Sequence, residues 1–218
     1  MKIGILGAGA VGMAIGKGLC EKGYEVMMGS NHVQKPSLQD FQATFPGKGF
    51  LGSLQETAVW GDLIVLCTTW QSAQLSIEQA GVWNFKSKIV VDVTNPLDDK
   101  GPDANGKISF QLHKNLSAGE QIQAWLPGAH VVKALNSIGH GHMINPQFKE
   151  GAPSMFICGN NDWAKKAVKD ILQQLGWPDV IDIGGIEIAR EIEALSVLWW
   201  AYGFRTGTWH HAFRLLRE

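Results

Sequence analysis

The chain has 218 residues, and its 19 Lys and Arg against 20 Asp and Glu give a formal net charge of -1. A hydrophobic content of 45% and a charged content of 18% are typical of a globular protein and exclude a disordered tail. The near-neutral balance argues against a nucleic-acid-binding protein, which needs a basic surface.

The chain shows no sign of export or membrane insertion. No apolar run reaches the roughly 18–20 residues that a membrane helix needs. Gly7 interrupts the apolar start, so we expect no signal peptide. Cys20, Cys67 and Cys158 lack CxxC spacing and are expected to be reduced, mostly buried thiols. The sequence therefore predicts a cytoplasmic protein with no nucleic-acid or membrane partner.

The expected elements alternate between strands and helices in the first half of the chain. Apolar periodicity predicts, in order, a strand at 2–6, a helix at 11–21, a strand at 24–28, a helix at 38–44, a strand at 50–51, a short helix after Ser53, a strand at 63–67, a helix at 72–80 and a strand at 89–93. The segment 95–115 is rich in Gly, Pro, Asp and Asn and is expected to be a long loop.

The second half continues the alternation. It is expected to contain a short helix after Ser117, strands at 131–135 and 155–158, an amphipathic helix at 162–175, a strand at 180–183 and a helical region at 186–216. Capping boxes are expected at Ser37 with Asp40, Ser53 with Glu56 and Ser117 with Glu120, and Asn161 is expected to cap the helix at 162–175. Strands that alternate with helices predict an α/β protein with a doubly wound, mostly parallel sheet.

The segment Gly7-Ala8-Gly9-Ala10-Val11-Gly12 has GxGxxG spacing and lies directly between the first strand and the first helix. Gly7 permits a tight turn, Gly9 lets the backbone approach a pyrophosphate, and Gly12 lets the helix pack on the strand. The free N–H groups at the helix start attract phosphate. The pattern predicts a Rossmann-type dinucleotide site, and we expect Gly9→Asp or Gly12→Val to abolish binding in a folded chain.

The residues after the second expected strand favour NADP over NAD. NAD-selective sites place Asp or Glu there, about 20 residues after the glycines, to bind the ribose 2′-hydroxyl. Here Gly29 is followed by Ser30, Asn31 and His32, with no acid. Ser30 and Asn31 can donate hydrogen bonds to a 2′-phosphate, and His32 and Lys35 can add positive charge. The alternative is that these are ordinary polar loop residues.

Polar residues also follow three later strands, where ligands bind in open α/β sheets. They are Thr68, Thr69 and Trp70, then Thr94, Asn95 and Pro96, then Asn136 and Ser137. Thr and Asn can bond ribose or carboxamide groups, and Pro96 would fix the loop beneath the nicotinamide. The alternative for each is a turn residue that satisfies its own backbone.

Together these motifs resemble the F420-dependent NADP oxidoreductases. The resemblance rests on the glycine turn, Gly29-Ser30, Thr68-Thr69-Trp70, Asp92-Val93-Thr94-Asn95-Pro96, Lys133-Ala134-Leu135-Asn136-Ser137, Gly184-Gly185, Ala189-Arg190 and Glu193. The cytoplasmic domains of STEAP-type metalloreductases are similar too. The family usually has Arg after the serine of the second strand, and Asn31 stands in its place, which weakens the expected recognition of the 2′-phosphate.

The resemblance implies hydride transfer between NADP(H) and a small-molecule redox acceptor, either the deazaflavin F420 or a flavin. It implies that Gly7, Gly9, Gly12 and Ser30 contact the cofactor and that Trp70 and Asn95-Pro96 lie near it. Transfer between two bound rings needs no catalytic side chain or metal, and we expect neither. His140-Gly141-His142 and His210-His211 are expected to be loop and surface or interface pairs.

The last residues are unusually aromatic. One expected helix face carries Ile188, Ile192, Leu195, Leu198 and Trp199, and several aromatic residues follow. We expect a homodimer interface, a wall for an aromatic second substrate, or both, with core packing as the alternative. Gly184-Gly185 marks the expected boundary between an NADP-binding domain at 1–185 and a helical tail at 186–218.

Two other functions remain open. One is a dinucleotide-binding regulatory or sensor protein without turnover. The other is a dehydrogenase of a small imine or hydroxy acid, which needs a proton donor near the nicotinamide. Lys133 is the obvious candidate for that donor, but it is expected within a strand rather than at its end.

Overall fold

The computed structural model describes residues 1–98, 100–104, 107–111 and 116–218. The strands are β1 (Lys2–Leu6), β2 (Glu25–Gly29), β3 (Gly49–Gly52), β4 (Leu63–Leu66), β5 (Ile89–Asp92), β6 (His130–Lys133), β7 (Ser154–Gly159) and β8 (Asp179–Asp182). The helices are α1 (Ala10–Glu21), α2 (Pro36–Thr44), α3 (Leu54–Trp60), α4 (Trp70–Ala80), α5 (Ala118–Trp125), α6 (Asp162–Gln174) and α7 (Ala189–Thr206). Short 3-10 turns lie at Val82–Phe85, His140–His142 and Ile186–Ile188.

The eight strands of the described residues form one sheet in the order β3-β2-β1-β4-β5-β6-β7-β8. Neighbouring strands are parallel except β6 and β7, which pair antiparallel at Val132 with Gly159 and Lys133 with Cys158. The chain leaves β1 toward β2 on one side and later returns to β4 on the other side of β1. The strand order thus reverses between β1 and β4, and this is where doubly wound sheets bind ligands.

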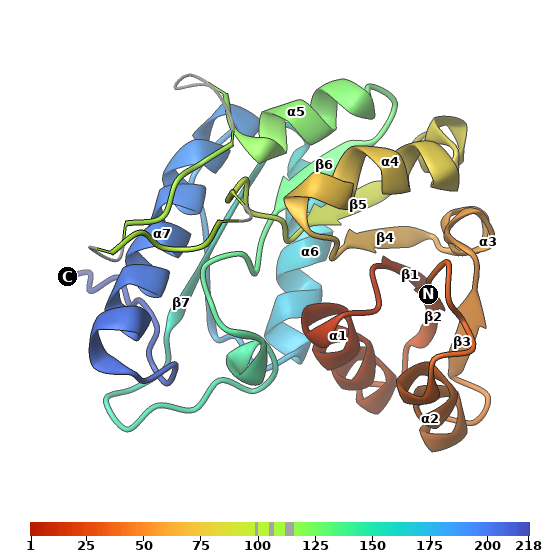
Figure 1. The fold of residues 1–218 in the computed structure, drawn as a ribbon, viewed down its shortest axis with the longest axis horizontal. Coiled ribbons are helices and arrows are strands. Elements are labelled where there is room, and N and C mark those ends of the chain that lie inside the picture. The colour runs from red at the N-terminus through yellow and green to blue at the C-terminus, as the bar shows by residue number, and fades with distance from the viewer. Residues whose placement is uncertain (99, 105–106, 112–115) are drawn as a thin grey trace.

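Helices cover both faces of the sheet (Figure 1). One face packs on α1, α2 and α6, and its core includes Ile5, Leu19 and Val168. The other face packs on α3, α4, α5 and α7, and its core includes Leu66 and Ile122. The predicted doubly wound, mostly parallel fold is therefore confirmed.

Local signals account for most helix starts. Ser53 and Ser117 form complete capping boxes with Glu56 and Glu120, as expected. The expected capping box at Ser37 is wrong. Helix α2 begins at Pro36, two residues before its expected start, and a proline with its fixed φ is favoured at the first helical position.

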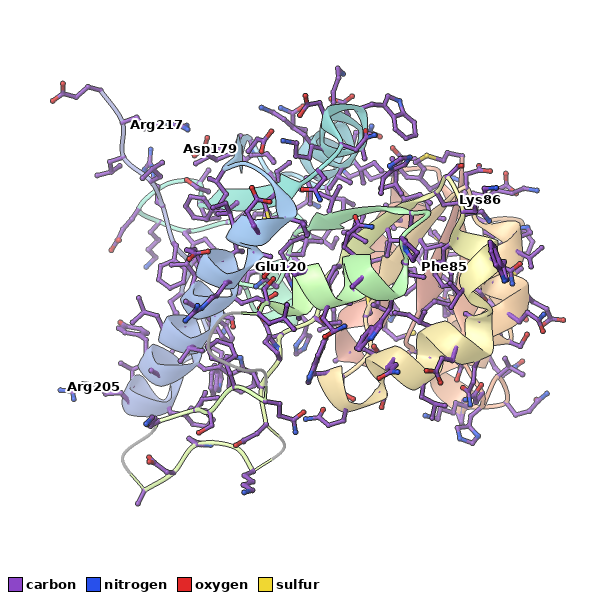
Figure 2. The ribbon with its side chains drawn as sticks, turned by 90° about the horizontal axis from the view of Figure 1, so that it is seen from above. Phe85, Lys86, Glu120, Asp179, Arg205 and Arg217 are labelled. Atoms are coloured by element: carbon purple, nitrogen blue, oxygen red, sulfur yellow. The ribbon has the colours of Figure 1, made fainter. Side chains whose placement is uncertain are left out.

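The C-terminal region is only partly helical, so the expected helix to residue 216 is wrong. Helix α7 ends at Thr206, because Gly207 adopts a left-handed conformation with φ of 68°. The residues after it, 207–218, run beside the start of β7, where the Ser154 N–H donates to the Phe213 carbonyl over 2.9 Å. Arg217 near the end of this segment pairs with Asp179 at the start of β8 (Figure 2).

The expected thiols and loop are largely as predicted. Cys20 and Cys158 are buried, Cys67 is half-buried, and all three are free thiols. Of the expected loop at 95–115, the described residues contain one isolated bridge, between Leu97 and Phe110. Residues 99, 105–106 and 112–115 of that loop lie outside the described part of the chain.

Candidate functional site

The glycine turn joins β1 to α1 with very close backbone packing. Gly7 has φ of +112°, and a Cβ on it would lie 2.7 Å from the backbone of Cys67, which follows β4. A Cβ on Gly12 would lie 2.0 Å from the Gly7 carbonyl oxygen. A valine here would force the turn and α1 apart, so we expect Gly12→Val to destabilise the fold rather than to leave it intact.

Gly9 differs from its neighbours because it faces open space. A Cβ placed on it meets no atom of the described residues within 4 Å. Gly9 is the N-cap residue of α1, and no described side chain caps this end of the helix. The first N–H groups of the helix, on Ala10 and Val11, therefore lie beside that open space with the positive end of the helix dipole.

The residues after β2 form a polar turn. The Ser30 hydroxyl accepts a hydrogen bond from the His32 N–H at 3.0 Å, and the Asn31 side-chain amide donates to Gln79 of α4 at 2.9 Å. His32 and Lys35 are exposed. Ser30 and Asn31 line a hollow of about 490 Å³, but His32 and Lys35 are not among its lining residues.

The same hollow contains a carboxylate, that of Glu56, whose sequence pattern predicts only helix capping. Glu56 lines it together with Ser30 and Asn31. Hydrogen bonds from the Ser53 backbone and side chain lower the pKa of Glu56, so the carboxylate is ionised. Both contacts are made by one carboxylate oxygen, Oε2.

The three residues after β4, Thr68, Thr69 and Trp70, have different surroundings. Thr69 is the N-cap residue of α4, and its hydroxyl bonds to Ser72 at 3.1 Å. The Thr68 hydroxyl is buried and has no hydrogen-bond partner among the described residues. The Trp70 ring stacks on Trp125 of α5 with ring centroids 5.4 Å apart, so it links two helices on one face of the sheet.

Asn95 and Asn136 join the ends of β5 and β6. The Asn95 amide donates to the Asn136 carbonyl at 2.8 Å, and the Asn136 amide donates to Asn95 Oδ1 at 2.9 Å. Asn136 is 5% exposed, and its side-chain oxygen has no partner among the described residues. Such an unpaired buried acceptor is costly unless a ligand donates to it.

Thr94 and Pro96 flank Asn95 and have different surroundings. The Thr94 hydroxyl and N–H both donate to Asp92 Oδ1 at 2.8 Å, so the hydroxyl points into the protein. The Pro96 carbonyl accepts from the Gln111 N–H at 2.7 Å, which ties this loop to the segment that returns over it. The buried Ser137 completes the turn after β6.

Behind these loops lies a buried ion cluster. Lys133 is the last residue of β6, not an interior one as expected, and its Nζ lies 2.7 Å from Asp92 and 2.8 Å from Glu193 of α7. Burial lowers the pKa of Lys133, but the two carboxylates raise it more, so the lysine stays charged. It is fully buried and held by both acids, which argues against a role as proton donor.

Glu193 connects this cluster to α5. Its two carboxylate oxygens accept hydrogen bonds from the N–H groups of Ala118 and Gly119, each at 3.1 Å. These residues form the first turn of α5, which lies against α7 near Glu120 (Figure 2). The N-terminal helix dipole adds to the stabilisation of the carboxylate.

A mainly apolar cavity of about 450 Å³ lies beside the strand ends. Its walls come from α1, from the loops after β5 and β6, from the turn at His140–His142 and from the C-terminal region. The lining residues include Val11, Asn95 and Asn136 on one side and Trp199, Trp200 and Trp209 on the other. The cavity thus adjoins the glycine turn and reaches the aromatic cluster of the tail.

The structure therefore brings most of the expected site residues to one edge of the sheet. The glycine turn, Thr68, Asn95 and Asn136 follow four adjacent parallel strands. Within the described ranges, no group of three or more His, Cys, Asp or Glu side chains could hold a metal ion. No described helix is long and apolar enough to cross a membrane.

Comparisons with known proteins agree with this geometry. Residues 2–96 match the family described as NADP oxidoreductase, coenzyme F420-dependent. The chain is similar to a proposed F420-dependent NADP-reductase from Arthrobacter sp. FB24, with 33% identity, a TM-score of 0.91 and full coverage of both chains.

Two further relatives are more distant. An F420-dependent NADP reductase of Methanocaldococcus jannaschii is 29% identical over 147 residues, which cover 66% of this chain and 63% of that enzyme. The match therefore spans less than two thirds of that enzyme's length. An imine reductase from Myxococcus stipitatus in complex with NADP+ has a TM-score of 0.66 at 14% identity, covering 95% of this chain and 63% of the other. At this identity the likeness extends to the fold alone.

Proposed function

Because the chain belongs to the F420-dependent NADP oxidoreductase family, we propose that it transfers a hydride between NADP(H) and a deazaflavin or flavin-like acceptor. The observation that carries the proposal is the cavity that extends from Val11, Asn95 and Asn136 to the tryptophans of the tail. A hydride donor and an acceptor ring must lie in contact, and a single cavity between the glycine turn and an aromatic wall allows this.

The residues around the glycine turn fit a dinucleotide. The open space beside Gly9 and the uncapped start of α1 offer room and N–H donors for a pyrophosphate. The unpaired oxygen of Asn136 and the unpaired hydroxyl of Thr68 are buried polar groups that a ribose or carboxamide would satisfy. When bound, the nicotinamide supplies the hydride chemistry.

We propose that the remaining site residues also contact the bound dinucleotide. Ser30, Asn31, His32 and Lys35 would bind the 2′-phosphate, where Asn31 replaces the arginine typical of the family. Glu56, which lines the same hollow as Ser30 and Asn31, adds one negative charge, and this charge weakens phosphate binding there. The remaining proposed contacts are Gly7, Ala10, Val11, Gly12, Thr69, Trp70, Thr94, Asn95 and Pro96.

The tail residues would bind the acceptor. Trp199, Trp200 and Trp209 pack edge-to-face or tilted on one another with ring centroids 5.2–5.8 Å apart, which makes a rigid aromatic wall. Such a wall can stack on a planar ring and exclude water from the transfer. We therefore propose that residues 1–185 bind NADP(H) and that residues 186–218 bind the acceptor and form a homodimer, in a cytoplasmic enzyme.

Anaerobic mixing of the protein with NADPH and either F420, FMN or FAD tests the activity. We expect NADPH absorbance near 340 nm to fall with multiple turnovers in the presence of at least one acceptor. Binding of NADPH without turnover on any of the three would instead favour a dinucleotide sensor. The control variant is Gly9→Asp, which should abolish turnover with every acceptor.

A further inference from the structure

Two histidines from distant parts of the chain share a hydrogen bond at the wall of the cavity. His142 belongs to the turn at His140–His142, and His210 lies in the segment after α7. His142 Nε2 lies 3.0 Å from His210 Nδ1, and both residues line the cavity. Their ring centroids are 4.9 Å apart and the two ring planes are nearly perpendicular. At the nitrogen–nitrogen distance of this hydrogen bond, one imidazole donates and the other accepts.

The other lining residues leave little choice for proton transfer. Among the described residues that line the cavity, only His140, His142 and His210 have a titratable side chain. Lys133, Asp92 and Glu193 lie behind the strand ends, where they are fully engaged with one another. Of the described side chains at this cavity, the histidines are therefore the ones that can pass a proton to or from a bound ligand.

The proposed reaction needs such a proton. When a flavin-like ring accepts a hydride, the electron pair leaves negative charge on the ring, and one proton completes the reduction. We propose that the His142–His210 pair donates this proton to the acceptor and takes it back in the reverse direction. This inference rests on the proposed function and adds a pair of catalytic residues to it.

The step balances as one hydride and one proton. The oxidised acceptor forms one new bond to the hydride from the dihydronicotinamide and one to the proton from the imidazole. NADP+ and a neutral imidazole pair remain, and the pair regains its proton from solvent. In the reverse direction the neutral pair accepts the proton while NADP+ accepts the hydride.

The surroundings of His142 set the pH range of this exchange. Burial lowers its pKa, and the neighbouring His210 and His211 lower it further. The other ring against it is Phe148, with centroids 4.9 Å apart. The adjacent residue Ile144 packs on Gly18 of α1, so no charge is contributed at that contact. Because like charges repel, a charge on His210 makes His142 harder to protonate.

His211 fixes the position of the neighbouring His210 through its contacts with Trp199. Its Nε2 lies 2.8 Å from the Trp199 carbonyl, and the Trp199 indole N–H donates to the His211 carbonyl at 2.9 Å. The two rings are stacked with centroids 4.8 Å apart. The backbone that carries His210 is therefore fixed to the same tryptophan that lines the cavity.

The test uses the double variant His142→Gln/His210→Gln with NADPH and the acceptor that the parent reduces fastest. In the parent, kcat for acceptor reduction should fall as pH rises through the pKa of the pair, and kcat for the reverse reaction should rise. In the variant, kcat should drop by about 100-fold, as loss of a general acid does, and both pH profiles should become flat. The Kd for NADPH should stay within about twofold, a change of less than about 0.5 kcal/mol.

The single variant His210→Gln gives a second, independent readout. It removes one like-charged neighbour of His142, so the midpoint of the pH profile should move to higher pH. His130→Gln is the matched control, because His130 lies at the amino end of β6, opposite to the strand end beside the cavity, and is not among the lining residues, so both profiles should stay unchanged.

The outcomes separate the two proposals. If the parent reduces no acceptor, both the proposed function and this inference fail. If the parent turns over but the double variant keeps kcat within about threefold and the same pH profiles, the inference alone fails. If the double variant unfolds, an unmoved midpoint in His210→Gln likewise overturns it, and a shifted midpoint supports it.

Discussion

Lys133 Nζ and Glu193 Oε1 lie 2.8 Å apart in the interior, so that a charged pair fastens the end of β6 to α7. Asp92 at the end of β5 is the third member, 2.7 Å from the same Nζ. The cluster lies directly behind the loops that carry Asn95 and Asn136. It therefore ties the proposed cofactor loops to the helix that carries the aromatic wall.

We predict that Lys133→Met strongly destabilises the protein, by about 3–5 kcal/mol in the free energy of unfolding. The substitution would leave two carboxylates buried without a cation. The matched control is Lys166→Met on α6, whose ion pair with Asp170 is exposed and should be worth less than about 1 kcal/mol. Urea denaturation of both variants measures the difference, and equal effects would show that the buried cluster contributes nothing special.

The sequence places one charged residue in each of two apolar strands, but the pattern of a single strand does not show that these two residues are partners. Asp92 and Lys133 are the last residues of two apolar strands, and the structure pairs them directly in register. In the sequence each lies inside its expected strand, at 89–93 and at 131–135, and neither position predicts a partner for the charge. Their contact depends on the order of strands in the sheet, and the partner Glu193 depends on where α7 packs, which local patterns do not encode.

Local patterns were sufficient where the cause is local. The glycine turn, two capping boxes and the strand positions follow from neighbouring residues, and all are found. The end of α7 and the His142–His210 contact were missed for a different reason. Gly207 ends α7 through its left-handed backbone, and two residues 68 positions apart meet only because the segment after Gly207 turns back along β7.

We predict that Gly9→Asp abolishes NADPH binding without unfolding the chain. A Cβ at this position meets no described atom within 4 Å, so we expect the substitution to cost little in the free protein, but its charge would repel a pyrophosphate. We expect the Kd to rise at least about 100-fold, or about 2.7 kcal/mol. Fluorescence titration measures it, and unchanged affinity would refute the phosphate site.

Gly12→Val provides the structural contrast to this variant. Its Cβ would lie 2.0 Å from the Gly7 carbonyl oxygen, so we expect a lower unfolding temperature rather than a specific loss of binding. Circular dichroism during heating should separate the two glycine variants. Equal unfolding temperatures would mean that α1 moves away from the turn without cost.

We predict that Asn31→Arg strengthens NADPH binding by about 1–2 kcal/mol, because a charge-assisted bond replaces a neutral one. The substitution loses only the exposed bond to Gln79. NADH is the internal control, since it lacks the 2′-phosphate and should bind the variant and the parent equally. Calorimetric titration that shows NADH preferred by the parent would contradict the assignment of NADP.

We predict that the protein is a homodimer whose interface includes the outer face of α7. Leu198 and Tyr202, one helical turn apart, are 56% and 50% exposed although both are largely apolar, and pairing of such a face with its copy would bury them.

Removing all residues from 186 onward would be a poor test of the dimer, because it also removes the buried Glu193 and Ile192. Leu198→Glu changes only the surface, and it should convert the protein to a species near the chain mass of 23.8 kDa in sedimentation. Glu191→Gln, an exposed change on the first turn of α7, should leave the sedimentation of the parent unchanged. A parent that already sediments as a monomer at every concentration would contradict the dimer, and the exposed face of α7 would then need another explanation.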